Sequence, residues 1–198
     1  VELARRAVTL DPMDSRSQLC LGWSLVMAKN YAQGATHMEL ACELNPNDSW
    51  TLISAGLCLA YCGNVELASD LANQSLGLTL SPSPLHWAYQ VQIAFLRADY
   101  DAALEAADRA QDVMRAMVGW RAATLFHLGR IEEAGRAARR FLNLIRSAWF
   151  GTEPPTDEAI GRWLLHMFPI RHAADWERLR DGVEGAGIPT GDAAHHDW

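Results

Sequence analysis

The feature that most constrains the fold is a set of small and apolar residues that returns about every 34 positions. In residues 30–48, NYAQGATHMELACELNPND, a larger apolar residue is followed by further small or apolar residues three, seven and ten positions later. The same offsets recur in three later blocks. The positions are Tyr31, Gly34, Met38 and Ala41; Val65, Ala68, Ala72 and Ser75; Tyr100, Ala103, Ala107 and Ala110; and Ile131, Ala134, Ala138 and Phe141. Because these offsets place side chains on one side of an α-helix, each block is predicted to be a helix that packs closely against a neighbour.

A second apolar segment precedes each block, and a turn signal separates the two. The turn signals are Lys29-Asn30, Gly63-Asn64, Ala98-Asp99 and Gly129-Arg130. Between blocks, Asn45-Pro46-Asn47-Asp48 and Ser81-Pro82-Ser83-Pro84 end one helix and start the next, because proline cannot continue a helix. The chain is therefore predicted to be all-α. We expect half a repeat over 1–12, then helix pairs over about 15–48, 49–83, 84–114 and 115–147.

This pattern resembles the tetratricopeptide repeat (TPR), whose signature clusters W-x2-L-G-x2-Y, then A-x3-F, then P within 34 residues. The matching positions in one copy are Gln18, Leu21, Gly22, Leu25, Gly34, Met38, Ala41 and Pro46. The resemblance implies antiparallel helix pairs stacked into a right-handed superhelix, or solenoid. It also implies an inner groove lined by the first helix of each pair.

That register predicts which residues would face a binding partner in the groove. They are Leu19, Trp23, Met27, Trp50, Ile53, Leu57, Tyr61, Gln92, Phe95, Leu96, Phe126 and His127. The set is aromatic and aliphatic with almost no charge, and it lacks the Lys, Asn and Arg clamp of carboxylate-binding co-chaperones. An apolar groove of this size would be covered by a bound helix or peptide, by a second copy, or by segments of the protein that are missing from this sequence. The alternative is that these residues are simply core between repeats.

After Phe150 the sequence changes character. GTEPPT is a linker, and two short amphipathic helices are expected in DEAIGRWLLHMF and HAADWERLRDGVEGAGIP. Residues 148–189 are predicted to be a linker and two helices that cap the end of the array, because a repeat array must close its last exposed face. Residues 190–198 are predicted to be disordered.

The tail also resembles the carboxyl-terminal end of certain bacterial signalling proteins. These join a class III adenylate/guanylate cyclase domain, or a winged-helix DNA-binding domain, to a tetratricopeptide array. The shared positions are Asp175, Arg178, Gly182, Ala186, Gly187 and Pro189. The resemblance implies that this chain is a regulatory part of such a protein. Any cyclase or DNA-binding domain is then expected upstream of Val1, outside this sequence.

The sequence contains no pattern that predicts catalysis within the chain. We find no phosphate-binding loop, no HExxH, no GxSxG and no set of metal ligands, so no catalytic, cofactor or metal residues are predicted. The net charge of -7 argues against binding to nucleic acid or to an anionic membrane. No apolar run approaches the ~20 residues of a membrane span. Four cysteines in apolar helical patterns fit buried thiols in a cytoplasmic protein. The functions left open are a non-catalytic interaction or oligomerisation module and the structural part of a cyclase.

Overall fold

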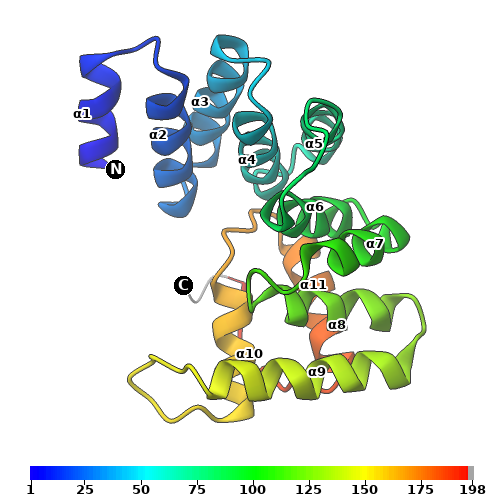
Figure 1. Ribbon diagram of the computed structural model, residues 1–198. Helices are drawn as coiled ribbons and strands as arrows, with labels where there is room; N and C mark the ends of the chain where they lie inside the picture. The colour runs from blue at the N-terminus through cyan, green and yellow to red at the C-terminus, as the bar shows by residue number, and fades with distance from the viewer. Residues whose placement is uncertain (196–198) are drawn as a thin grey trace.

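A computed structural model of the chain describes residues 1–195 as eleven α-helices without a β-strand (Figure 1). The prediction of an all-α fold is therefore confirmed over the described part. The helices are α1 Glu2–Leu10, α2 Ser15–Met27, α3 Tyr31–Leu44, α4 Ser49–Tyr61, α5 Val65–Gly77, α6 Pro84–Leu96, α7 Tyr100–Ala110, α8 Met117–His127, α9 Ile131–Arg146, α10 Asp157–His166 and α11 Ala173–Gly185. Within these residues, no helix is both long and apolar enough to cross a membrane.

Eight of these helices form four consecutive pairs. They are α2 with α3, α4 with α5, α6 with α7 and α8 with α9, and each pair packs against the next. The first helices also touch in a row, α2 on α4, α4 on α6 and α6 on α8. The small positions predicted to permit close packing, Gly34, Ala68, Ala103 and Ala134, are all buried. The repeated stripe in the sequence is thus the packed side of each second helix.

The turn inside each pair has the same geometry four times. The second residue after the first helix has a positive φ at Lys29 (62°), Gly63 (92°), Ala98 (62°) and Gly129 (73°). The next N–H then reaches back to a carbonyl five residues earlier, at 2.8–2.9 Å in all four turns. This is the Schellman ending of a helix, which satisfies carbonyls that have no partner within the helix. Only two of the four positions carry glycine, the residue suited to this conformation.

Close approach between paired helices depends on glycine in the first full pair. A β-carbon added at Gly34 would lie 2.4 Å from Val26 Cγ2, and one added at Gly22 would lie 2.7 Å from Met38 Cε. Both distances are shorter than real side chains tolerate, so α2 and α3 can touch here only without side chains. This contact offsets the ~1 kcal/mol that glycine costs inside a helix.

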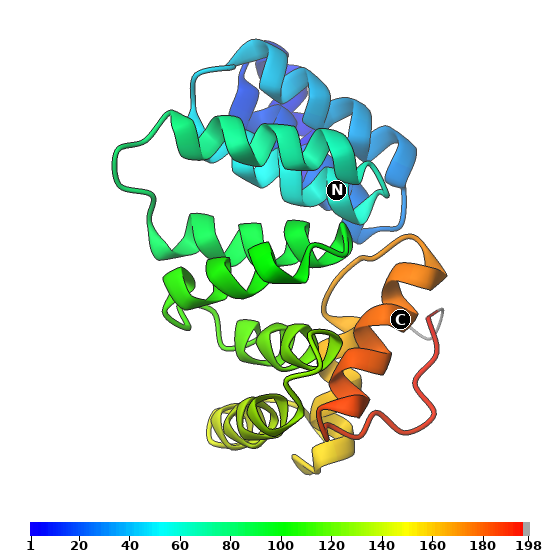
Figure 2. The ribbon, with the colours of Figure 1, turned by 90° about the vertical axis from the view of Figure 1, so that its right-hand side faces the viewer.

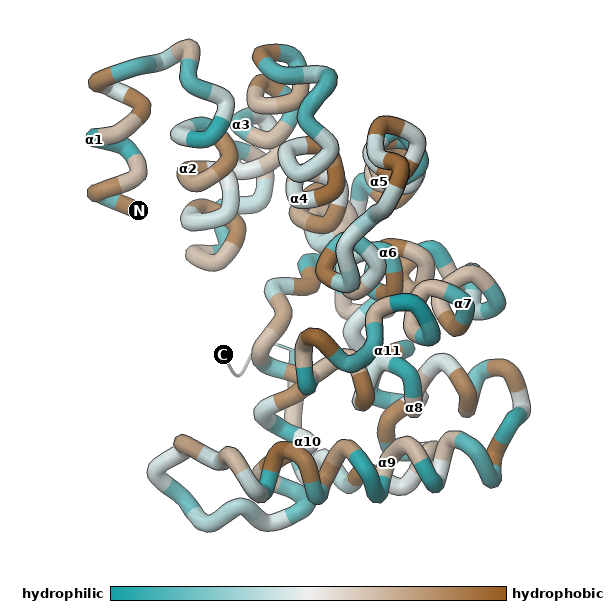
Figure 3. The backbone as a smooth tube through the Cα atoms, in the orientation of Figure 1, coloured by the Kyte–Doolittle hydropathy of each residue, from teal (hydrophilic) through white to brown (hydrophobic). Residues whose placement is uncertain are grey.

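Helix α1 is the least packed element. None of its residues is buried, and the side chains of Leu3 and Leu10 are 82% and 79% exposed. Figure 3 shows apolar positions at both ends of this helix. One side of α1 rests on α2, and most of its other side is exposed.

Both helices of the tail contact the last pair, α10 through α9 and α11 through α8 (Figures 1 and 2). The tail also reaches the ends of α4 and α6, which the prediction of a cap at the end of the array did not include. The physical reason is that the polypeptide turns back at Pro169 and runs along the row of first helices. Residues 190–195 also differ from the predicted disorder, because Thr190 and Ala193 are buried. Residues 196–198 lie outside the described part.

Candidate binding groove

The structure places the twelve predicted groove residues in three environments. Seven are buried, with 7% of their surface exposed or less: Leu19, Ile53, Leu57, Tyr61, Gln92, Phe95 and Leu96. Trp23, Phe126 and His127 are half-buried. Met27 and Trp50 are exposed, by 51% and 37%. The set is therefore not one open apolar stripe, and part of it is core between repeats.

The tail of the chain covers the groove from its middle to its carboxyl-terminal end. The ring of Phe168 lies 6.1 Å from Tyr61 and 5.2 Å from Trp120, centroid to centroid. The N–H of Arg171 donates to the carbonyl of Tyr61 at 2.9 Å. Sequence reasoning assigned this covering to a partner, a second copy or segments of the protein missing from this sequence, and it did not consider the tail. In the structure, residues 167–185 cover this part of the groove.

Two arginines of the tail hold it to the ends of the first helices. Arg171 Nη1 donates to the carbonyl of Cys62 at 3.4 Å, beside the last turn of α4. Arg178 Nη1 donates to the carbonyl of Leu96, the last residue of α6, at 3.1 Å. Helix carboxyl ends carry partial negative charge and free carbonyls, so a cation stabilises them by about 0.3–1 kcal/mol each. The two contacts fasten the tail to two successive repeats.

Two glycines let α11 approach α8 closely. A β-carbon at Gly182 would lie 2.7 Å from Ala123 Cβ, and one at Gly185 would lie 2.2 Å from Phe126 Cε2. The ring nitrogen Nε2 of His127 is 2.9 Å from the carbonyl of Arg178. The predicted groove residues Phe126 and His127 are therefore contact residues for α11.

The amino-terminal half of the groove keeps an open pocket of about 170 Å³. Five of the predicted residues line it: Trp23, Met27, Leu57, Tyr61 and Gln92. The Trp23 and Tyr61 rings meet edge to face at 6.1 Å, and Trp23 Nε1 donates to Ser54 Oγ at 2.9 Å. The Tyr61 hydroxyl donates to Gln92 Oε1, so the deepest polar atoms are already satisfied. Burial raises the pKa of Tyr61, which keeps its hydroxyl neutral.

Sequence reasoning missed the residues that close this pocket. They are Tyr89 on α6, Met114 in the connection after α7, and Met167, Phe168 and Pro169 after α10. Met167-Phe168-Pro169 is an apolar stretch that ends on a helix-breaking residue, and it was interpreted only as the end of a helix. The three apolar residues could have indicated that this stretch packs against another part of the chain, because an exposed loop does not need apolar side chains.

One cluster outside the groove brings a hydroxyl and an imidazole together. Ser49 Oγ lies 3.0 Å from His86 Nε2, and Ser83 Oγ lies 2.8 Å from His86 Nδ1. The Ser49 hydroxyl also donates to the carbonyl of Ser75 at 3.0 Å. A nucleophilic serine needs a base oriented by a third group and an open reaction site. Here the third group is another hydroxyl, and the Ser49 hydroxyl is already hydrogen-bonded to Ser75. We therefore interpret the cluster as hydrogen bonds that join α4 and α5 to the start of α6.

The cysteines form no disulfide among the described residues. Cys58 and Cys62 are buried one helical turn apart, and Cys62 Sγ donates to the carbonyl of Tyr31 at 3.6 Å. Burial raises the pKa of the Cys42 thiol to about 11. Cys20 is exposed, contrary to the expectation of a buried thiol. No group of three or more His, Cys, Asp or Glu side chains in residues 1–195 could hold a metal ion.

Comparison with known proteins adds no family to this description. No protein-family model matches the chain, and a search of curated proteins finds no match either. The functional argument therefore rests on the groove and on the repeat pattern.

Proposed function

We propose that this chain is a non-catalytic protein-interaction module that binds an apolar helix of a partner protein. Its helix pairs are proposed to be tetratricopeptide-like and to stack as a right-handed superhelix. The binding site is the open pocket between α2, α4 and α6. The support comes from the recurring pairs and from a groove whose first helices lie in a row.

One observation carries the proposal: the exposed apolar side chains beside the pocket continue its lining. Met27 and Trp50 are large, apolar and more than a third exposed, on neighbouring first helices. Trp50 packs against Tyr89, a pocket residue, with ring centroids 5.3 Å apart. Methionine and aromatic side chains in a groove suit an apolar helix face, which needs adaptable contacts and few hydrogen bonds.

We further propose that the module is the regulatory, carboxyl-terminal part of a bacterial signalling protein in the cytoplasm. The support is the tail motif, whose Arg178 and Gly182 are residues that dock α11. Such a tail would hold the helix pairs in one fixed arrangement. The sequence that flanks this segment in its gene tests the point: a cyclase-type pair of carboxylates or a basic recognition helix would support it. A flanking sequence with neither would contradict it.

A displayed library of amphipathic helical peptides tests the binding function. Peptides selected on the purified chain should lose at least tenfold in affinity for the Met27→Glu variant, because a carboxylate would enter the apolar pocket without a partner. Leu67→Glu is the matched control, since Leu67 on α5 is 40% exposed and does not line the pocket.

Equal binding of the selected peptides to wild type and to Met27→Glu would exclude this pocket as the site. Failure to select any peptide would contradict the proposal as a whole. Circular dichroism of both variants should match wild type, because both side chains already lie at the surface. Sedimentation velocity of the free chain detects the remaining alternative, in which a second copy fills the pocket.

A further inference from the structure

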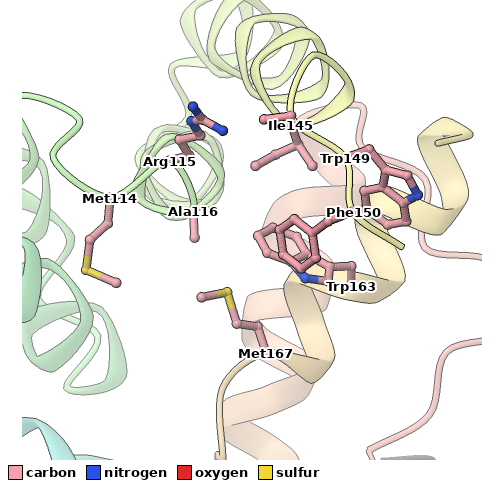
Figure 4. A pocket seen from close by; sticks show the side chains of 9 residues that line it. Met114, Arg115, Ala116, Ile145, Trp149, Phe150, Trp163 and Met167 are labelled. Carbon is pink, nitrogen blue, oxygen red and sulfur yellow. The ribbon is translucent and has the colours of Figure 1, made fainter. Parts of the chain in front are cut away.

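A second pocket, of about 280 Å³, lies next to the first and shares Met114 and Met167 with it (Figure 4). Its walls come from the connection between α7 and α8, the end of α9 with the loop that follows, and α10. Figure 4 shows Met114 and Ala116 on one side of the space and Phe150, Trp163 and Met167 on the other. The sequence analysis assigned no ligand-binding role to any of these residues.

The lining is almost entirely apolar. Trp163 meets Trp149 at 6.5 Å and Phe150 at 6.4 Å, both edge to face. The indole N–H of Trp149 donates to the carbonyl of Glu153 at 2.7 Å, so this indole has no N–H left to offer a ligand. Phe150 is 84% exposed, and Met114 and Met167 complete the wall with flexible side chains. An apolar group in the pocket would cover the Phe150 ring.

One charged residue stands at this pocket, and it is cationic. Arg115 lines the pocket and is exposed. It makes no ion pair with any carboxylate in residues 1–195. No acidic residue lines the pocket, and Asp112, three residues before Arg115, already pairs with Arg140. Arginine stays charged and presents a planar set of donors that matches a carboxylate.

We propose that this pocket binds a medium-chain fatty acid. The acyl chain lies among the aromatic and methionine side chains, and the carboxylate pairs with the guanidinium of Arg115. The volume of about 280 Å³ is just below the ~300–1,000 Å³ typical of ligand pockets, so the ligand is a medium rather than a long chain. The site is separate from the proposed helix-binding pocket, although Met114 and Met167 border both.

Isothermal titration calorimetry with three probes tests the proposal: octanoate, octanol and octyltrimethylammonium. Octanoate should bind at least tenfold more tightly than either other probe, because only the carboxylate can pair with Arg115. Arg115→Gln should weaken octanoate at least tenfold and leave octanol unchanged. Arg139→Gln is the matched control, because Arg139 is also exposed on the surface but does not line the pocket. Phe150→Ala should weaken octanoate and octanol by similar factors.

Equal affinity for the three probes, or an Arg115→Gln variant that binds octanoate as wild type does, would overturn the proposal. So would the absence of any heat with octanoate. A dimer that dissociates on Phe150→Asp and ignores octanoate would assign the pocket to a second copy instead. Met27→Glu should leave octanoate binding intact, so failure of the helix-binding proposal and failure of this one can be told apart.

Discussion

At the scale of single residues, the four repeated turns differ in how well their residue suits the backbone. Ala98 and Gly129 occupy the same position of two turns, with φ of 62° and 73°. A left-handed conformation costs a residue with a β-carbon about 1–2 kcal/mol, and glycine avoids that cost. Ala98 is exposed, so no packing compensates for the strain.

We therefore expect Ala98→Gly to stabilise the chain by about 0.5–1 kcal/mol, after the greater freedom of glycine in the unfolded chain is subtracted. Gly129→Ala should destabilise it by a similar amount. Nothing lies within 4 Å of an added β-carbon, so the cost comes only from the left-handed backbone conformation. Urea unfolding followed by circular dichroism measures both. A destabilising Ala98→Gly would show that the turn is not strained.

Protonation of His86 provides a second prediction at this scale. Burial lowers the pKa of His86 below its ordinary value, and Asp48 opposes the shift. The unfolded chain, with a histidine pKa of about 6.5, then takes up protons at a higher pH than the folded chain does. The free energy of unfolding should consequently fall as the pH is lowered from about 7.5 to about 5.5.

In a His86→Gln variant, this fall in stability should be smaller than in wild type. The pKa of His37 is also lowered, chiefly by burial, so part of the pH dependence should remain. Urea midpoints at several pH values give the comparison. Identical slopes for wild type and His86→Gln would contradict the assignment.

At the scale of elements, the contact between α11 and α8 depends on glycine. Gly182→Val should drive branched methyl groups into Ala123 and destabilise the chain by about 1–3 kcal/mol, the usual cost of overpacking. Gly135→Ala is the matched control within α9. Its nearest neighbour would lie 3.6 Å away, so it should stabilise the helix by about 0.5–1 kcal/mol.

Hydrogen exchange locates the effect of the Gly182 substitution. Faster exchange in α11 with unchanged exchange in α2–α5 would show that only the docking is weakened. Uniform acceleration along the whole chain would instead make α11 part of the global folding unit.

The elements that could be predicted from sequence are those whose signals are local. The helix pairs follow from offsets such as Tyr31, Gly34 and Met38 and from turn residues such as Gly63 and Gly129. The path of the tail could not be predicted, because Gly182 and Gly185 look like ordinary helix-end glycines until α8 is placed beside them. The same long-range contact explains why Leu96 and Phe126 were assigned to an open groove. Only two of the twelve residues, Met27 and Trp50, proved exposed.

At the scale of the whole molecule, the tail contacts several helix pairs at once. Without the tail, each pair would contact mainly the pairs next to it. Its contacts reach α4, α6 and α8 in turn. Removal of residues 148–198 should lower the free energy of unfolding by at least about 3 kcal/mol, because Tyr61, Trp120 and Phe126 would lose the apolar contacts that the tail makes with them.

The shortened chain should also unfold over a broader range of urea, as expected for repeats that interact only with adjacent ones. It should bind more of a hydrophobic dye than the complete chain does, since Tyr61 and Phe126 become accessible. An equally sharp transition for both chains would mean that the array is cooperative without its tail.

The fold-back of the tail also restricts how such a gene can change. Tandem arrays are extended or shortened by duplicating or deleting whole units, and most arrays accept this because each unit recognises only its neighbours. Here Arg171 meets the end of α4 and Arg178 meets the end of α6, seven residues apart along the tail. An extra unit between them would separate the two anchor points while the tail keeps its length. The copy number of the units between α4 and α8 is thereby held at its present value.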